Sequence, residues 1–309
     1  MRIIILSPTF NTFVSPAEKA RLRRAGHVTV YDTPTPISTL KALMTGTEPR
    51  VIALDPDFCN WKAPPELFSR VPSLKAICLQ TTSFSWINTE MAKMCGIPVT
   101  NLRHWSTESV AEWVIMMTCN LARKVPLIAK AHRRGDFSTQ QGIELAGKTI
   151  GVVGLGHIGK RVAELANGMG MNVQYWSVHS RDRRFHYVPL PFLMRTSDII
   201  VPAVAQNSQT KGLLTDQLLR TMKPNAMFVS VVHTMYSHEL LLKMVARNKL
   251  YGYAFEETED RQGKRFYKGN VLALPANAWV TKEAQQKNME QWVQTIVDAA
   301  KGKFPQRVN

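Results

Sequence analysis

Three glycines, Gly154, Gly156 and Gly159, stand at the G-x-G-x-x-G spacing that binds the pyrophosphate of a dinucleotide. The first glycine of such a run allows a tight turn, the second lets a phosphate approach the backbone, and the third lets a helix pack against its strand. His157 and Ile158 lie between the last two glycines, where a new helix would present free N–H groups to the phosphates. We therefore predict that this turn contacts a dinucleotide cofactor.

These glycines can act only if a strand brings the chain to the turn and a helix leaves it. Residues 149–153 are an uncharged run rich in β-branched residues, which is typical of a buried parallel strand. Apolar residues at helical spacing follow the turn, at Ile158, Val162 and Leu165, and residues 173–176 form a second strand-like run. The order strand, turn, helix, strand predicts a Rossmann-type βαβ unit. The alternative is a βαβ unit whose glycine-rich turn holds no ligand.

The end of the second strand decides which dinucleotide the turn would hold. An acidic side chain is expected there, about 20 residues past the glycines, to bind the ribose 2′-hydroxyl of NAD(H). This chain has Ser177 instead, followed by Ser180, Arg181, Arg183 and Arg184. Hydroxyls and guanidinium groups bind a 2′-phosphate, which a carboxylate would repel. We therefore predict NADP(H) rather than NAD(H), with Ser177, Ser180 and Arg181 as contacts; the alternative is an ordinary solvated loop.

The chain has 309 residues and a formal net charge of +16. Its length suits about two domains. The charge would attract anionic substrates and cofactors, and it permits nonspecific binding to nucleic acids. A nucleic-acid function would need a basic stripe with interleaved aromatic residues or a known motif, and the sequence shows neither. We therefore expect an anionic small-molecule substrate as the partner and place nucleic acid last.

Four cysteines, Cys59, Cys78, Cys95 and Cys119, show no C-x-x-C pairing and no histidine-rich partner pattern. We interpret them as reduced, buried thiols of a cytoplasmic protein, and we expect no metal site. No apolar run is long enough to span a membrane, and residues 1–6 resemble a strand rather than a signal peptide. The expected location is the cytoplasm, with no membrane partner.

The first hundred residues alternate between strands and helices. The strand-like and helical runs fall at residues 2–6, 17–25, 28–31, 51–54, 74–79 and 89–94. This alternation predicts a small parallel α/β domain. From Ser106 the pattern changes to a long helix that reaches Arg123, and a further helix is predicted over residues 126–134.

Several stretches, in a fixed order, resemble the D-isomer-specific 2-hydroxyacid dehydrogenases. They are residues 96–101 (GIPVTN), 107–112 (TESVAE), 145–159 (LAGKTIGVVGLGHIG) and 218–226 (LLRTMKPNA). The resemblance covers nearly the whole chain. It implies two doubly wound parallel-sheet domains of the α/β class with a cleft between them.

The resemblance also divides the chain by role. A flavodoxin-like substrate-binding domain would comprise residues 1–100 together with the C-terminal helix in residues 281–309. A Rossmann dinucleotide-binding domain would comprise residues 101–280. The helices of residues 106–134 would reach a twofold partner, so the resemblance implies a homodimer.

The chemistry of the family is hydride transfer between a nicotinamide and the 2-carbon of a 2-hydroxy or 2-keto acid, with an arginine, a histidine and a glutamate at the site. Here His233 stands at the place of the arginine and Ala276 at that of the histidine. Val232, beside His233, is an implied cofactor contact. Glu256 is another, because it falls where the family's aspartate holds the nicotinamide amide.

The family glutamate has no clear counterpart. Without gaps, the match is Arg261. Glu257, Glu259 or Asp260 would take its place if the loop is shifted. The partner that would raise the basicity of a catalytic imidazole is therefore left open.

The substrate-side loop departs from the family as well. Relatives carry a G-x-D run whose backbone amides bind the substrate carboxylate, whereas residues 81–86 read TTSFSW. Ser83 stands at the place of the glycine and Ser85 at that of the aspartate, and Phe84 adds bulk. Thr82, Ser83 and Phe84 are the implied substrate contacts.

Three functions fit these observations. The first is an NADP(H)-dependent oxidoreductase with a rebuilt site, acting on an unidentified carbonyl or hydroxy compound, 2-keto-acid-like compounds included. In it His233 supplies an acid or an electrophilic contact, since the pKa of histidine lies near physiological pH. The second is a dinucleotide-binding module that has lost turnover, and the third is a binder of nucleic acid or another anionic partner. A binding module needs no histidine at the reactive carbon, so we favour the first.

Overall fold

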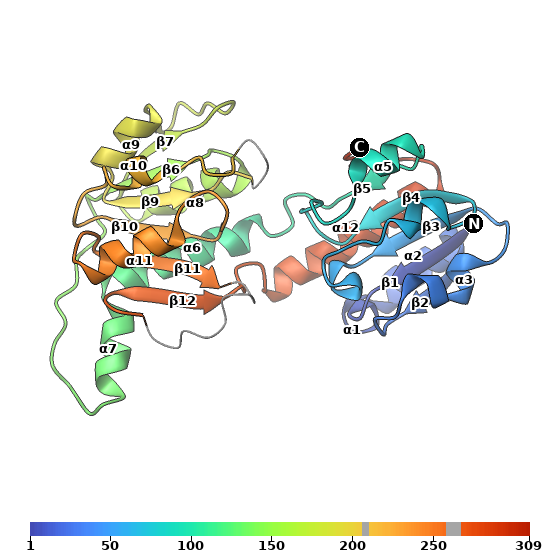
Figure 1. The fold of residues 1–309 in the computed structure, drawn as a ribbon, viewed down its shortest axis with the longest axis horizontal. Helices are drawn as coiled ribbons and strands as arrows, with labels where there is room; N and C mark the ends of the chain where they lie inside the picture. Colours follow the sequence, from blue (N-terminus) through green and yellow to red (C-terminus); the bar gives the residue numbers. More distant parts are fainter. Residues whose placement is uncertain (206–209, 258–266) are drawn as a thin grey trace. The chain divides into compact units, whose positions relative to one another are not determined.

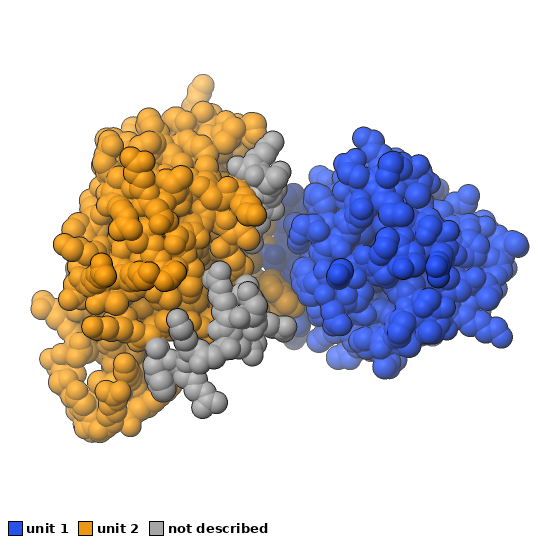
Figure 2. Space-filling model, in the orientation of Figure 1, with its two compact units in different colours: residues 1–106, 281–309 blue, residues 107–280 orange. Residues whose placement is uncertain are grey.

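The computed structural model describes residues 1–205, 210–257 and 267–309. The chain forms two compact units, unit 1 with residues 1–106 and 281–309, and unit 2 with residues 107–280 (Figure 2). Each unit has its own parallel sheet with helices around it (Figure 1). The chain therefore passes between the units twice, at residues 106–107 and at residues 280–281.

Unit 1, all of whose residues are described, has a five-stranded sheet with the strand order β2-β1-β3-β4-β5. The strands are β1 (Arg2–Leu6), β2 (His27–Tyr31), β3 (Arg50–Leu54), β4 (Leu74–Leu79) and β5 (Val99–Thr100). The helices are α1 (Phe10–Phe13), α2 (Pro16–Ala25), α3 (Lys41–Met44), α4 (Glu66–Ser69), α5 (Thr89–Met94) and α12 (Lys282–Ala300). This order is the flavodoxin-like one, and the predicted fold class is confirmed for this unit.

The C-terminal helix α12 belongs to unit 1 because its side chains complete the core of that unit. Trp292 is fully buried, and its Nε1 donates to the carbonyl oxygen of Cys78 in β4 at 3.0 Å. Met289, Val293 and Ile296 are buried in the same cluster as Ile3 and Ile5 of β1. Residues far apart in the sequence thus share one core.

In unit 2, the described residues form a seven-stranded parallel sheet with the order β12-β11-β10-β9-β6-β7-β8. The strands are β6 (Thr149–Val153), β7 (Asn172–Trp176), β8 (His186–Tyr187), β9 (Ile199–Pro202), β10 (Met227–Ser230), β11 (Gly252–Glu257) and β12 (Val271–Pro275). The helices are α6 (Thr107–Ala122), α7 (Val125–His132), α8 (His157–Gly168), α9 (Leu190–Thr196), α10 (Asp216–Leu219) and α11 (His238–Ala246). The order reverses between β6 and β9, and ligands of such sheets bind at the carboxyl ends of the strands at this reversal.

Both faces of the unit 2 sheet are covered, which explains the uninterrupted apolar character of its strands. Successive residues of β6 point to opposite faces. Val152 belongs to the core cluster that contains Val114 of α6 and Val162 of α8. Val153 belongs to the cluster that contains residues of α9 and α11, such as Leu193.

The structure changes a few predicted boundaries. The long helix ends at Ala122 and the next begins at Val125, because Lys124 adopts a left-handed backbone with φ of 52° between them. No strand was predicted at β5, β8, β9, β11 or β12. The strands β5 and β8 have only two residues each, and both residues of β8 are exposed. The interpretation of all four cysteines as buried is wrong for Cys95, which is exposed at the end of α5. Cys59 and Cys119 are half-buried, and only Cys78 is fully buried.

Among the described residues all four cysteines are free. Burial raises the pKa of the Cys78 thiol to about 12 and that of Cys59 to about 11, so both stay protonated at neutral pH. Within the described ranges, no cluster of three or more His, Cys, Asp or Glu residues could hold a metal ion. No helix in the described part of the chain is both long and apolar enough to cross a membrane.

Candidate cofactor and active site

The glycine-rich turn leaves the carboxyl end of β6 and leads into α8. Gly154 has φ of +101°, and a Cβ there would lie 2.3 Å from Cγ1 of Val204. A Cβ on Gly159 would lie 2.0 Å from the carbonyl oxygen of Gly154. The fold itself therefore requires glycine at both positions, one for its backbone conformation and close contact, the other for close packing.

Gly156 differs, because a Cβ there would meet no described atom within 4 Å and its φ of −76° suits any residue. Packing does not require a glycine here, and the open space is what a phosphate needs to approach the backbone. Gly156 is also the N-cap of α8, so no side chain caps this helix and its first turn carries no acidic residue. The partly positive amino end of α8 is thus available to an anion, and this turn fits a pyrophosphate.

The loop after β7 lies beside this turn, since the backbone N–H of Gly154 donates to the carbonyl oxygen of Trp176 at 2.7 Å. Ser177 is 7% exposed, and its Oγ accepts a hydrogen bond from the N–H of Ser180 at 3.2 Å. The hydroxyl proton of Ser177 is therefore left to donate to a ligand. Ser177 and Ser180 thus lie in one turn of the loop after β7.

Arg181 is held in one orientation by its own loop. Its Nη1 donates to the carbonyl oxygens of Ser177 and Ser180, each at 2.9 Å, and its guanidinium carbon lies 4.0 Å from the centre of the Tyr187 ring. Among the described residues its Nε and Nη2 have no hydrogen-bond partner. A stacked guanidinium whose Nε and Nη2 nitrogens are unused is suited to bind a phosphate.

Asp182 is an acidic residue in the same loop as Arg181, and its carboxylate is paired with basic side chains. Arg184 donates to it from Nη2 at 2.8 Å, and Nζ of Lys160 lies 3.2 Å from Oδ2. The hydrogen bonds from Arg184 hold the pKa of Asp182 well below its usual range. The backbone N–H of Asp182 donates to the hydroxyl of Tyr175 at 2.9 Å, which anchors the loop on β7.

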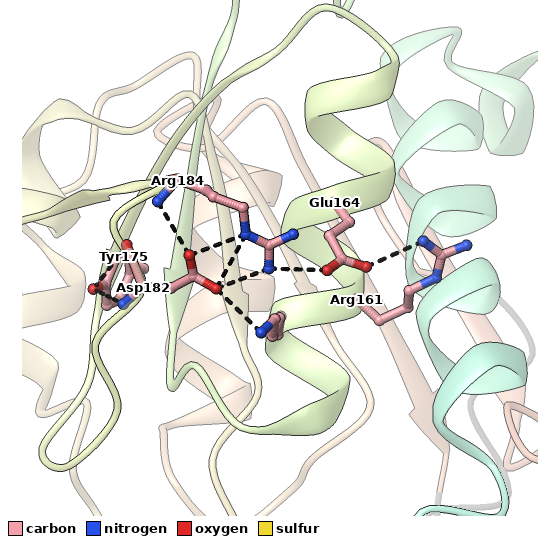
Figure 3. Close-up of polar contacts among 6 residues, drawn as sticks. Arg161, Glu164, Tyr175, Asp182 and Arg184 are labelled. Atoms are coloured by element: carbon pink, nitrogen blue, oxygen red, sulfur yellow. Dashed lines mark hydrogen bonds and ion pairs between the residues drawn. The ribbon is translucent and has the colours of Figure 1, made fainter.

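The ion pairs extend from this loop across α8 to α6. Arg184 also donates to Glu164 at 3.1 Å, and Arg161 donates to Glu164 at 3.2 Å (Figure 3). Arg161 makes a further pair with Glu108 of α6 at 2.7 Å. Of the arginines predicted around the ribose, Arg184 is therefore engaged with acidic residues, whereas Arg181 is not.

His233 lies half-buried in the turn that follows β10. In this turn the carbonyl oxygen of Val232 accepts two hydrogen bonds, from Ser230 Oγ at 2.9 Å and from the Tyr236 hydroxyl at 2.8 Å. The backbone N–H of Val232 donates to Ser230 Oγ at 3.1 Å. A cofactor contact through the Val232 carbonyl would therefore have to replace one of these donors.

Glu256 sits at the end of β11 and is 5% exposed. Its Oε1 accepts from the backbone N–H groups of Asn277 at 2.8 Å and Ala278 at 2.7 Å. Burial raises the pKa of Glu256 above its ordinary value, against the opposing effect of these two hydrogen bonds. Glu256 thus holds the segment after β12 in place through Oε1. Among the described residues, this leaves its second oxygen, Oε2, for the predicted nicotinamide contact.

The predicted substrate loop belongs to unit 1. The carbonyl oxygen of Thr82 accepts from Asn101 Nδ2 at 2.7 Å, and its hydroxyl accepts from Trp105 Nε1 at 3.1 Å. Ser83 Oγ lies 3.5 Å from Ser85 Oγ, and the Phe84 ring is exposed. The loop is anchored by side chains of residues 101–105, and its hydroxyls and aromatic ring lie at the surface of the unit.

Comparison with known proteins identifies the family. Residues 115–277, more than half of the chain, match "D-isomer specific 2-hydroxyacid dehydrogenase, NAD binding domain". The chain belongs to this family. Over 261 residues, this dehydrogenase is 27% identical to a glycerate dehydrogenase of Methylorubrum extorquens, covering 79% of the chain and 81% of the relative. It is 27% identical over 258 residues to a glyoxylate reductase of Pyrococcus furiosus, covering 78% and 77%.

Solved structures show the same fold. An acyclic imino acid reductase in complex with NADPH and D-Arg superposes on the dehydrogenase with a TM-score of 0.85 at 24% identity, and both chains are covered completely. A D-lactate dehydrogenase with NAD+ from Lactobacillus jensenii gives a TM-score of 0.78 at 18% identity, covering 100% and 99% of the two chains. The two structures contain different cofactors, NADPH and NAD+, and at these identities their likeness to the chain concerns the fold alone.

The resemblance to the family assigns the reacting centre to positions where this chain carries other residues. The position assigned by resemblance to the arginine carries the half-buried His233, and the position assigned to the histidine carries Ala276, whose side chain is exposed. Glu259, Asp260 and Arg261, named above for the glutamate, lie outside the described residues. Glu257 is described, and its Oε1 accepts from the Tyr267 hydroxyl at 2.5 Å.

Sequence reasoning missed two groups of residues in this dehydrogenase. Lys160 and Asp182 were not predicted as functional residues. Their charges could have indicated them, since Lys160 lies one turn into the helix after the glycine turn and Asp182 lies among the arginines of the next loop. Tyr253 and His238 join Tyr236 through hydrogen bonds, and nothing in their sequence spacing announces this contact. Only the pairing of β10 with β11 brings them together.

Proposed function

We propose that the protein is an NADP(H)-dependent oxidoreductase that transfers a hydride to or from a carbonyl or hydroxy compound carrying a negative charge. Unit 2 would hold the cofactor, and unit 1, with the predicted contacts Thr82, Ser83 and Phe84, would hold the substrate. Membership of the dehydrogenase family supports the reaction class. The finer assignments depend on this chain's own residues.

One observation carries the choice of NADP(H), namely the loop after β7. It offers the Ser177 hydroxyl and two unused donors of Arg181, and its one nearby carboxylate, on Asp182, is already paired with two cations. An NAD-binding loop would instead present a carboxylate to the ribose 2′-hydroxyl. A 2′-phosphate fits this arrangement because guanidinium groups bind phosphate in a bidentate manner.

The chemistry then divides between cofactor and protein. A bound nicotinamide supplies or accepts the hydride. In the proposed mechanism His233 holds the proton that the developing alkoxide receives, or gives a positive contact to the substrate when it is an imidazolium. Glu256 would orient the carboxamide through Oε2, since its Oε1 is used by the backbone of residues 277 and 278.

A second candidate function is a dinucleotide-binding module without turnover. The observation that favours it is the combined replacement at the positions assigned to the family's arginine, histidine and substrate-loop glycine, which carry His233, Ala276 and Ser83. The cofactor turn at Gly154, by contrast, keeps the geometry of a phosphate site. This alternative predicts cofactor binding without reaction.

The deciding experiment is a titration of the purified protein with NADPH and NADH, followed by reduced-cofactor fluorescence. Charge-assisted hydrogen bonds to a phosphate contribute about 1.5–3 kcal/mol, so Arg181→Ala should weaken NADPH binding about 10- to 100-fold. NADH affinity should stay within about twofold, because NADH lacks the 2′-phosphate.

The matched control is Arg183→Ala, which removes the same charge from the same exposed loop. It should change NADPH affinity by less than about threefold. Equal NADPH and NADH affinities in the wild type, or no effect of Arg181→Ala, would overturn the NADP(H) assignment. A panel of 2-keto acids in the same cuvette then separates turnover from binding alone, and an active His233→Ala variant would remove His233 from the mechanism.

We also propose that the protein is a homodimer. Helix α7 has no buried residue of its own, and it projects from the rest of unit 2 (Figure 1). Val125 and Ile128 are 39% and 43% exposed, and Phe137, just beyond the helix, is 79% exposed. An apolar helix left bare in this way is typical of a surface that a partner covers.

Light scattering should give the dimer a mass of twice 34.9 kDa. Ile128→Asp should halve that mass, because it places a charge in the contact. Met94→Asp, which changes an exposed methionine in unit 1, is the control and should leave the dimer intact. A wild-type protein that elutes as a monomer would contradict the proposal.

A further inference from the structure

Three side chains beside the His233 turn form a continuous chain of hydrogen bonds. Nδ1 of His238 lies 2.9 Å from the hydroxyl of Tyr253, and the Tyr253 hydroxyl donates to that of Tyr236 at 3.1 Å. The Tyr236 hydroxyl donates to the carbonyl oxygen of Val232 at 2.8 Å. The chain thus runs from the first residue of α11, through β11, to the residue that precedes His233.

The direction of this chain is fixed by its last acceptor. A carbonyl oxygen can only accept, so Tyr236 uses its single proton on Val232. Its oxygen must then accept the proton of Tyr253, and Tyr253 in turn must accept from His238. The imidazole of His238 therefore carries a proton on Nδ1 in both its neutral and its charged form.

Aromatic packing holds the three members in place. Tyr253 is fully buried and stacks on Phe255 at 4.7 Å between ring centres, and it pairs in register with Phe228 of β10. The Tyr236 ring lies 4.9 Å from that of Phe228, and the His238 ring lies 4.4 Å from that of Phe255. Because Tyr253 is fully buried, its hydroxyl makes these two hydrogen bonds out of contact with water.

We propose that Tyr236, Tyr253 and His238 are positioning residues for the nicotinamide half of the cofactor site. The chain fixes the Val232 carbonyl, and with it the turn that carries His233. This turn follows β10, on the opposite side of the strand-order reversal from β7 and its arginine loop. In a doubly wound sheet the two halves of a dinucleotide lie on the two sides of that reversal. This consequence depends on the proposed function; the hydrogen-bond chain does not.

The chain is tested first without any ligand. In protein labelled with ¹⁵N-histidine, long-range ¹H–¹⁵N correlation at about pH 8 distinguishes the Nδ1–H from the Nε2–H form of neutral imidazole. His238→Asn identifies the His238 signal among the eight histidines by removing it. We expect Nδ1–H in the wild type and a shift toward Nε2–H in Tyr253→Phe. An Nε2–H form in the wild type, or no change in Tyr253→Phe, overturns the chain.

The positioning role is tested by comparing two ligands, NADPH and 2′-phospho-ADP-ribose, which lacks the nicotinamide. Tyr253→Phe and His238→Phe should weaken NADPH binding about tenfold and leave 2′-phospho-ADP-ribose within about twofold. His238→Asn, unlike His238→Phe, should keep NADPH affinity near the wild-type value, since an asparagine N–H can replace the Nδ1 donor. Tyr251→Phe is the matched control, because it removes a hydroxyl that donates to the carbonyl oxygen of Ala122 elsewhere in unit 2.

Equal weakening of both ligands would show a general structural role and overturn the proposal, as would unchanged NADPH affinity in both Phe variants. Failure of the proposed function has a different signature. In that case the wild type would bind neither ligand, while the histidine tautomer would still decide whether the hydrogen-bond chain exists.

Discussion

The two sides of the strand-order reversal in unit 2 differ in how closely their residues follow the pattern of the family. On the β6 and β7 side, the glycine turn keeps the spacing and backbone geometry of a phosphate site, and a network of ion pairs holds the arginine loop. On the β10 and β11 side, the positions that carry the family's catalytic arginine and histidine hold His233 and Ala276. By the resemblance, the pattern that binds phosphates is present on the first side, and the catalytic residues of the family are replaced on the second. Following the proposed function, we call these the retained side and the rebuilt side.

In the proposed function, binding of the cofactor phosphates and reaction of the substrate thus depend on different parts of one domain. Phosphate binding depends on backbone N–H groups and on the absence of a side chain at Gly156, so few substitutions are tolerated there. The reacting side depends on side chains at strand ends, which can change without disturbing the sheet. His233 follows β10 and Glu256 lies near the end of β11, and buried residues of both strands belong to the core clusters of unit 2.

The largest expected effect comes from a substitution that blocks the proposed phosphate site on the retained side alone. In Gly156→Val the new Cβ meets no described atom within 4 Å, so the free energy of unfolding should change by less than about 1 kcal/mol. It would fill the space proposed for the pyrophosphate, and NADPH affinity should fall more than about 100-fold. Urea unfolding and fluorescence titration measure the two quantities.

Gly159→Ala is the matched comparison, because its Cβ would lie 2.0 Å from a backbone oxygen. It should lower both stability and binding, since packing would have to shift. Normal NADPH binding by Gly156→Val would mean that the open space is not the pyrophosphate site, and the contrast between the two sides would lose its basis.

The same contrast explains what the sequence could predict. The fold class, the strands β1 to β4, β6 and β7, and the glycine turn follow from short periodic patterns and local spacing. Two contacts could not be predicted in this way, the ion pair of Asp182 with Lys160 and the hydrogen bond between Tyr236 and Tyr253. In each case the spacing of the two residues in the sequence matches no helix or strand repeat. Such contacts are set by strand register and by the path of loops, which a single sequence does not encode locally.

A smaller effect tests the arginine loop. Asp182→Asn removes a negative charge close to the proposed 2′-phosphate and releases Lys160 and Arg184 from a competing carboxylate. The loop should keep its place, because the backbone N–H of Asp182 still donates to Tyr175. NADPH affinity should therefore rise about threefold to fivefold, with NADH unchanged, as expected for charges near a protein surface.

The control is Asp216→Asn in α10, which makes the same change in charge outside the loop. The rise in NADPH affinity should shrink at high salt, since the charges involved are partly exposed. A loss of NADPH affinity in Asp182→Asn would show instead that the carboxylate is needed to order the loop, and the adenosine side would then depend on side-chain pairing as much as on its backbone.

The smallest expected effect concerns Glu256 on the rebuilt side. Burial raises its pKa in the folded protein, so the protonated carboxyl is favoured by the fold. Its contribution to stability is full below the pKa of the unfolded chain and is lost as pH rises through the higher folded value. Glu256→Gln removes this titration while keeping an oxygen that can accept from the backbone of Asn277 and Ala278.

Compared with the wild type, Glu256→Gln should therefore gain in relative stability between about pH 4.5 and pH 7.5. Urea unfolding at both pH values measures the difference. Parallel pH dependences for the two proteins would mean that the backbone hydrogen bonds offset burial completely. The expected divergence would mean that the rebuilt side keeps an acid at a cost to stability, which is characteristic of a residue retained for a ligand rather than for the fold.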